Sequence, residues 1–144
     1  MSVILEAFPK LKTSSLFAVT SPPDEQYNCI AWAAQDTARF WWPDRMQTAF
    51  WPAMAPRAET IEAFVAAFAS LRYEECDSPE LEADFQRVAI YAIEDRPTHA
   101  ARQLPNGRWT SKLGKAEDIQ HLPEDIEGSL YGRVVRILRR RRSP

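Results

Sequence analysis

Two residues far apart in the chain, Cys29 and His99, are of the types that perform nucleophilic catalysis together. Cys29 follows a polar, proline-containing segment (residues 21–26) and opens an expected helix. A thiol at a helix start lies near the positive end of the helix dipole and the free N–H groups of the first turn. Both favour the thiolate, which is the reactive form. His99 lies in a strand-like segment and has the ordinary pKa of a base near neutral pH. The order of these two residues predicts a cysteine nucleophile with a histidine base.

Acyl transfer also needs hydrogen-bond donors for the oxyanion. The backbone N–H of Cys29 can be one donor, and a side-chain amide from Gln26 or Asn28 can be the other. Asn28 is expected to cap the helix through its side-chain oxygen, so Gln26 is the better candidate. The rival interpretations are that Cys29 is a small buried apolar residue and that His99 bridges backbone groups.

A third group should orient the imidazole of His99. A hairpin is expected over residues 98–114, with Gly107 in the left-handed position of a bulged turn. That bulge puts Ser111 on the same face as His99, whereas a two-residue turn without it would bring Lys112 there. Ser111 is therefore the first choice for the orienting residue. The alternatives are Asp118 and Gln103.

The remaining elements follow from apolar periodicity and turn residues. Tryptophans around the first helix could line a substrate cleft or pack in the core, and the candidates for substrate binding are Trp32, Trp41, Trp42 and Trp51. Helices are expected over about residues 28–40 and 59–73, strands over about 85–94 and 130–138, a helical turn over 115–121, an acidic loop over 74–80, an irregular arm over 1–23 and a basic tail over 139–144.

Composition narrows the possible functions. The chain has 144 residues and a net charge of −2, which favours a single domain over residues 1–144 that binds neither nucleic acid nor membrane. No signal peptide or apolar span is evident, so a cytoplasmic location is expected. We expect no cofactor and no metal, because the cysteines and histidines (Cys29, Cys76, His99 and His121) lack the short spacing of zinc ligands.

Three short patterns resemble a small bacterial family of uncharacterised proteins: YNCIAWA at residues 27–33, THAARQ at 98–103 and GRWTSKLG at 107–114. These patterns in turn resemble the papain-like cysteine hydrolase superfamily. The resemblance implies an α+β fold in which N-terminal helices, one bearing the cysteine, pack on a small antiparallel sheet bearing the histidine. Matching the glycines puts Ser111 where papain-like proteases carry an orienting Asn, so this chain departs from the pattern at that position.

Two functions are therefore expected. The first is a cysteine-dependent hydrolase or acyltransferase that acts through Cys29 and His99 on an amide, isopeptide or thioester bond of a peptide or small amide substrate. The alternative is a non-catalytic interaction module on the same fold, such as an antitoxin-like protein that binds a protein partner. The oligomeric state does not follow from the residues.

Overall fold

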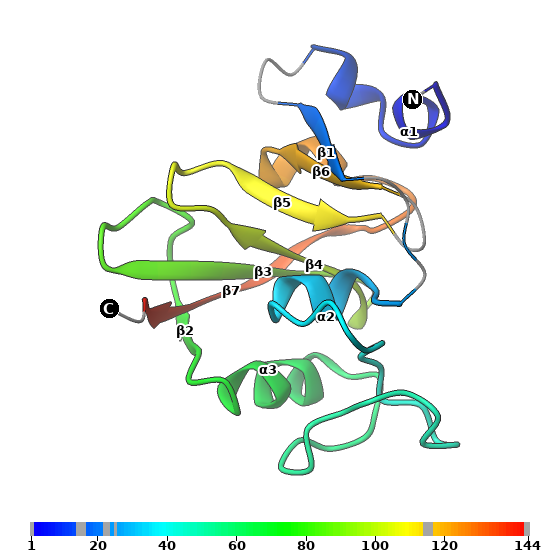
Figure 1. Ribbon diagram of the computed structural model, residues 1–144, viewed down its shortest axis with the longest axis vertical. Helices are drawn as coiled ribbons and strands as arrows, with labels where there is room; N and C mark the ends of the chain where they lie inside the picture. The colour runs from blue at the N-terminus through cyan, green and yellow to red at the C-terminus, as the bar shows by residue number, and fades with distance from the viewer. Residues whose placement is uncertain (1, 14–16, 22–23, 25, 114–116, 143–144) are drawn as a thin grey trace.

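The structure is a computed structural model that describes residues 2–13, 17–21, 24, 26–113 and 117–142. In the described part, strands form one antiparallel seven-stranded sheet in the order β1-β6-β5-β4-β3-β7-β2 (Figure 1). The strands are β1 Ala18–Ser21, β2 Glu74–Cys76, β3 Phe85–Ile93, β4 Arg96–Gln103, β5 Trp109–Lys112, β6 Asp118–His121 and β7 Arg133–Arg141. The helices are α1 Ser2–Ala7, α2 Cys29–Ala33 and α3 Ile61–Ala69, with short 3-10 helices η1 Pro9–Thr13 and η2 Pro123–Ile126.

The expected papain-like α+β fold, with N-terminal helices on a small sheet, is wrong. The sheet dominates the protein, and the described helices are short. The helix expected over residues 28–40 ends at Ala33, because Gln35 takes a left-handed backbone conformation (φ 64°). The Asp36 carboxylate then accepts the backbone N–H groups of Ala38 and Arg39, which stabilises a turn where the helix was expected to continue.

Several segments that were expected to be irregular or helical are strands. Residues 18–21 of the expected arm form edge strand β1, and residues 74–76 of the expected acidic loop form the opposite edge, β2. Residues 118–121 form β6, which pairs with β1 and β5. The part of the expected helical turn at residues 115 and 116 lies outside the described residues. β7 continues to Arg141, so most of the expected basic tail belongs to the sheet.

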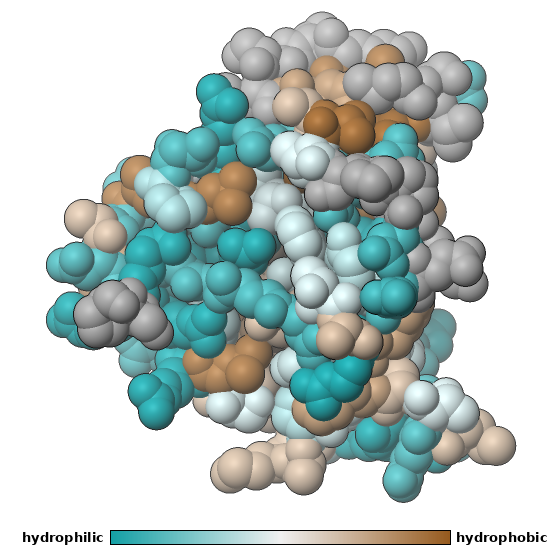
Figure 2. Space-filling model, viewed as in Figure 1, coloured by the Kyte–Doolittle hydropathy of each residue, from teal (hydrophilic) through white to brown (hydrophobic). Residues whose placement is uncertain are grey.

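Apolar side chains form one core cluster on each face of the sheet. On β3, Val88 and Ile90 join the cluster that includes α2 and α3, whereas Ala89 and Tyr91 join the cluster that includes α1 and η1. This alternation is that of a strand buried on both faces. Hydrophilic side chains cover most of the described surface in Figure 2, and the hydrophobic ones lie there in small separate groups. None of the described helices is long and apolar enough to cross a membrane.

The β4–β5 hairpin has the expected register. Gly107 has a positive φ of 88°, and Arg102 pairs with Thr110. Ser111 consequently lies on the same face as His99, and a hydrogen bond joins the two side chains. The bulged-turn prediction is confirmed, and Lys112 lies on the other face of β5, where its ammonium group is 5.2 Å from the ring centroid of Tyr27.

Candidate active site

Cys29 is the first residue of α2, and Asn28 is its N-cap, as expected. The side-chain oxygen of Asn28 accepts the N–H of Ala31 (3.2 Å) and the N–H of Trp41 (3.0 Å), and its amide donates to the carbonyl of Trp41 (2.8 Å). One buried side chain thus fixes the helix start and ties it to the aromatic loop that follows. The position of Cys29 is set by this network.

The thiol of Cys29 is neutral in the resting protein. Its residue is 7% exposed, and burial raises the pKa of the thiol to about 11. The backbone N–H groups of Ala100, Ile30 and Cys29 face the sulfur and oppose this shift, as does the charge of Lys112. Burial outweighs them, so the expected thiolate at a helix start is not the resting state. The α2 helix has 5 residues, too few to add up to a large dipole.

The sulfur lies against β4 beside His99. Ala100, whose N–H faces Cys29, is the next residue after His99 on this strand. Side chains alternate along a strand, and the ring of His99 follows its cross-strand partner Tyr91 to the opposite face. Among the hydrogen bonds between described residues, none joins the sulfur to the imidazole. The structure therefore brings Cys29 to the backbone next to His99 but leaves the nucleophile–base contact a prediction.

Tyr131 connects the two groups. Its ring stacks on the imidazole of His99, with the centroids 4.0 Å apart and the planes at 14°. Burial raises the pKa of the Tyr131 phenol, and the charge of Cys29 raises it further. A thiolate at Cys29 would therefore disfavour ionisation of the ring that covers His99. Sequence reasoning did not single out Tyr131.

A buried chain of hydrogen bonds holds His99. Its Nε2 lies 2.9 Å from Oγ of Ser111, and the same Oγ lies 2.6 Å from Nε2 of His121. Nδ1 of His121 lies 2.7 Å from the carbonyl oxygen of Leu122. All three side chains are 0% exposed. The structure therefore assigns the orientation of His99 to Ser111, as the sequence predicted, and adds His121 behind it.

The carbonyl of Leu122 fixes the direction of the protons along this chain. A carbonyl only accepts, so Nδ1 of His121 carries the hydrogen and Nε2 of the neutral ring accepts one from Ser111. The Ser111 oxygen must then accept from Nε2 of His99. Nδ1 of His99 is consequently free of a proton, and it is buried with no hydrogen-bond partner. This is the tautomer that a general base needs.

Both histidines are neutral in the folded protein. Burial, and to a lesser degree the charge of His121, holds the pKa of His99 well below its ordinary value. Burial lowers the pKa of His121 to about 4, against the opposing effects of the Leu122 carbonyl and Asp125. A proton on His99 would have to sit on Nδ1, where there is no acceptor.

The other candidate residues lie elsewhere. Gln26 is exposed, and none of the described hydrogen bonds brings its amide to Cys29. Asp118 accepts the hydroxyl of Tyr27 (2.9 Å) on the α2 face, and Gln103 donates to the carbonyl of Pro79 (2.9 Å). Neither contacts His99, so both alternatives to Ser111 are wrong.

The candidate tryptophans divide into two pairs. Trp41 and Trp51 are buried in the core, where they pack on Phe50 and Phe64. Trp32 is half-buried and donates from Nε1 to Oγ1 of Thr110 (3.0 Å). Trp42 is also half-buried, and it lines a hollow of about 610 Å³ together with residues that include Thr98 and Tyr131. Of the four rings, Trp42 is the one beside an opening near His99.

His121 is the residue of this site that sequence reasoning undervalued. It was assigned to a helical turn, whereas β6 alternates Ile119 and His121 toward the face that carries Ser111. A strand assignment for residues 118–121 would have put His121 on the same face as Ile119, and the pairing of Ile119 with Ser111 makes this the face of Ser111. Within the described part of the chain, no three side chains of His, Cys, Asp or Glu are grouped to hold a metal ion.

Together, these features define an antiparallel-sheet protein in which a cysteine at a helix start lies beside a buried His–Ser–His chain. The chain belongs to the family described as Domain of unknown function (DUF7689), which matches residues 18–139. That match includes all three patterns that carry Cys29, His99 and Ser111. No curated protein and no solved structure matches the chain.

Proposed function

We propose that the protein is a cysteine-dependent hydrolase or acyltransferase acting on an amide, isopeptide or thioester bond. The observation that carries this proposal is the state of His99. Its Nε2 is held by Ser111, and its Nδ1 has neither a proton nor a partner. The next N–H along β4, that of Ala100, faces the sulfur of Cys29. A base and a nucleophile of the required types thus lie at neighbouring positions of β4, on opposite faces of the sheet.

The chemistry assigns one role to each group. Nδ1 of His99 takes the proton of the Cys29 thiol, and the sulfur attacks the substrate carbonyl. The backbone N–H groups of Cys29 and Ile30, which already face the sulfur, are the available donors to the oxyanion. His99 returns the proton to the leaving amine or thiol as the bond to the carbonyl carbon breaks. Water or a second amine then cleaves the acyl-cysteine and regenerates the thiol.

In the resting structure the ring of His99 stacks on Tyr131 and lies on the face of β4 opposite Cys29, so the proposed transfer requires β4 and β5 to separate. The two strands pair only at Arg102 and Gln103, which leaves the stretch of β4 at His99 and Ala100 without pairing to β5. The hollow lined by Trp42, Thr98 and Tyr131 gives a substrate an approach to this side of the sheet. The side chains of Trp42, Ile93 and Leu130 in its lining offer apolar contacts to a peptide or a small amide.

The test compares alkylation of the two cysteines by iodoacetamide. Cys76, in edge strand β2, is the internal control, because it is more exposed than Cys29. We expect His99→Gln to slow alkylation of Cys29 at neutral pH by roughly tenfold or more without changing that of Cys76. An unchanged rate at Cys29 in this variant would contradict the proposal.

Burial favours a second candidate, the non-catalytic interaction module. Cys29 is 7% exposed and His99 is 0% exposed, and the resting thiol is neutral. Under this alternative both residues are structural. Mass spectrometry after incubation with an activated thioester separates the two functions. An acyl group on Cys29 supports the enzyme. The interaction module is supported if Cys29 carries no acyl group and the Cys29→Ala variant is folded and still binds its partner.

A further inference from the structure

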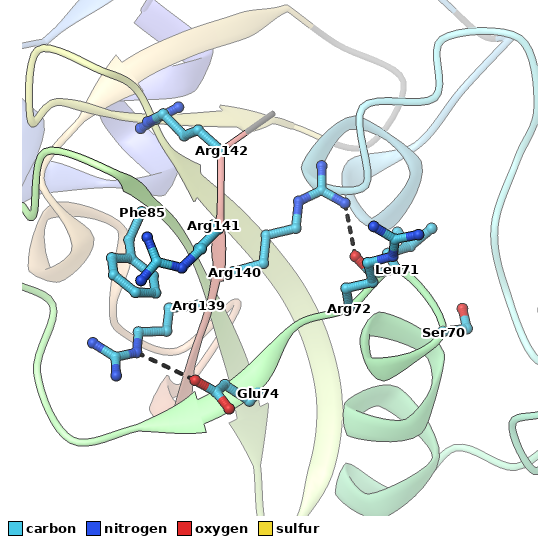
Figure 3. A pocket seen from close by; sticks show the side chains of 9 residues that line it. All are labelled: Ser70, Leu71, Arg72, Glu74, Phe85, Arg139, Arg140, Arg141 and Arg142. Atoms are coloured by element: carbon cyan, nitrogen blue, oxygen red, sulfur yellow. Dashed lines mark hydrogen bonds and ion pairs between the residues drawn. The ribbon is translucent and has the colours of Figure 1, made fainter. Parts of the chain in front are cut away.

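A hollow of about 1030 Å³ lies at the corner of the sheet where β7 ends (Figure 3). β2 stops pairing with β7 at Glu74 and Arg139, so no strand of the described residues pairs with the end of β7 on that side. The chain from α3 to β2 forms the opposite wall. The lining residues are Ser70, Leu71, Arg72, Glu74, Phe85, Arg139, Arg140, Arg141 and Arg142.

The hollow carries an excess of positive charge. Arg139 forms ion pairs with Glu74 (3.6 Å) and Glu82 (2.7 Å). The ion pairs among described residues include none for the other arginines of the lining, Arg72, Arg140, Arg141 and Arg142. Like charges that line one hollow repel one another, so an anion bound there would stabilise the arrangement. The excess is local, because the whole chain has a net charge of −2.

Aromatic rings and neutral oxygens hold several of these guanidinium groups in place. Arg139 and Arg141 lie beside Phe85, 4.3 and 5.1 Å from its centroid (Figure 3). Arg140 lies over Tyr73 at 4.6 Å and donates to the carbonyl of Leu71 (2.9 Å). Stacking fixes the plane of a guanidinium without neutralising its charge. The site is therefore organised before a ligand binds, which lowers the entropic cost of binding.

Arg142 is the last residue of the lining, and its Nη2 is buried without a hydrogen bond within the described structure. This atom is not itself exposed to the hollow, so the other arginines are the ones available to a ligand. The guanidinium fork matches the paired oxygens of a phosphate. Arg139 and Arg141 lie on one face of β7 and Arg140 on the other, so a ligand that reaches both groups must carry more than one phosphate (Figure 3).

We infer that this hollow binds a polyphosphate chain, either free or as part of a nucleotide. The inference is independent of the proposed hydrolase, because none of the lining residues contacts Cys29, His99 or Ser111 through a described hydrogen bond. The family match ends at residue 139, before Arg140, Arg141 and Arg142.

Calorimetric titration of the full chain with inorganic tripolyphosphate and with ATP tests the inference. The test variant is Arg72→Gln/Arg141→Gln, because both side chains are exposed and belong to the lining. The matched control is Arg45→Gln/Arg133→Gln, which removes the same charge from exposed positions outside the hollow.

We expect saturable binding of tripolyphosphate that weakens as salt is raised from about 50 to about 200 mM. The lining variant should bind at least tenfold more weakly, and the control should change by less than about twofold. If ATP and tripolyphosphate bind with equal affinity, the phosphate chain alone determines binding. If ATP binds more tightly than tripolyphosphate, the protein also contacts the nucleoside. No binding of either probe by the wild-type protein, or an equal loss in both double variants, overturns the inference.

Discussion

Replacing Ser111 by alanine removes the centre of the buried His–Ser–His chain. The hydroxyl of Ser111 makes hydrogen bonds of 2.9 and 2.6 Å, and the residue is 0% exposed. Ser111→Ala leaves the Nε2–H donor of His99 and the Nε2 acceptor of His121 without partners. Each unsatisfied buried group costs roughly 1–3 kcal/mol, so the loss in unfolding free energy should be about 2–6 kcal/mol.

Urea denaturation at neutral pH measures this loss. A change in the midpoint with an unchanged slope reports stability alone. The matched control is Thr110→Val, one residue earlier on β5 and on the opposite face, where the hydroxyl makes a single part-buried hydrogen bond with Trp32. That control should cost about 1 kcal/mol.

The result that would refute the reasoning is a Ser111→Ala protein no less stable than Thr110→Val. The two imidazoles would then find other partners, and the tautomer assigned to His99 would lose its basis. A second readout connects the chain to the proposed chemistry. Alkylation of Cys29 should slow in Ser111→Ala, because a His99 ring that is free to take either tautomer no longer keeps Nδ1 unprotonated.

Three further predictions follow from the same contacts. The pKa of His121 is lowered from 6.5 to about 4 in the folded protein, so the unfolded chain binds the proton first as pH falls. The free energy of unfolding should therefore drop by about 2 kcal/mol from about pH 7 to about pH 5, and His99 should add to this loss. A urea midpoint that does not change over this range would contradict the prediction. Tyr131→Ala uncovers the imidazole of His99 and should speed alkylation of Cys29 relative to the control Tyr131→Phe, which keeps the stacked ring; equal rates would show that the ring is no barrier. Asn28→Ala removes three hydrogen bonds at the start of α2 and should lower the melting temperature. The control Thr60→Ala removes one cap bond from α3, at a cost of about 1 kcal/mol, and should lower it less. Equal melting temperatures would contradict the assigned role of Asn28.

Local rules were sufficient where a single residue decides the structure. Asn28 caps α2, Thr60 caps α3, and Gly107 takes the left-handed turn position that sets the β4–β5 register. Each of these depends on one side chain and its immediate backbone. The register then placed Ser111 next to His99, which is why the orienting residue could be predicted from sequence.

Non-local pairing decided the elements that were predicted wrongly. β2 and β6 contain 3 and 4 residues, too few for a periodic pattern, and they are strands because β7, β1 and β5 lie beside them. The arginines at the end of β7 were expected to form a tail. They instead continue the strand, because β7 pairs with β3 as far as the pair of Phe85 and Arg141. The fold class was therefore predicted wrongly because it depends on long-range strand pairing, whereas the hairpin was predicted correctly because it depends on local geometry.

The charge state of Cys29 was predicted wrongly for a related reason. The N–H groups at the start of α2 act on the thiol as expected, because they favour the thiolate and lower the pKa of Cys29. Burial is stronger, and burial depends on how α2 packs against β4 and β5, which the sequence does not reveal. The desolvation that raises the pKa of Cys29 also lowers that of His99.

These opposite shifts set the condition under which the proposed pair could react. A thiolate alone in this interior is costly, and so is an imidazolium alone. A proton passed from Cys29 to His99 creates both charges together, so each becomes the counter-ion that the other lacks. The ring of His99 is stacked on Tyr131 and faces away from Cys29, so the proposed transfer also requires this part of the sheet to open. Burial therefore makes the neutral pair the resting state, and the proposed reaction depends on a structural change that brings the two charges together.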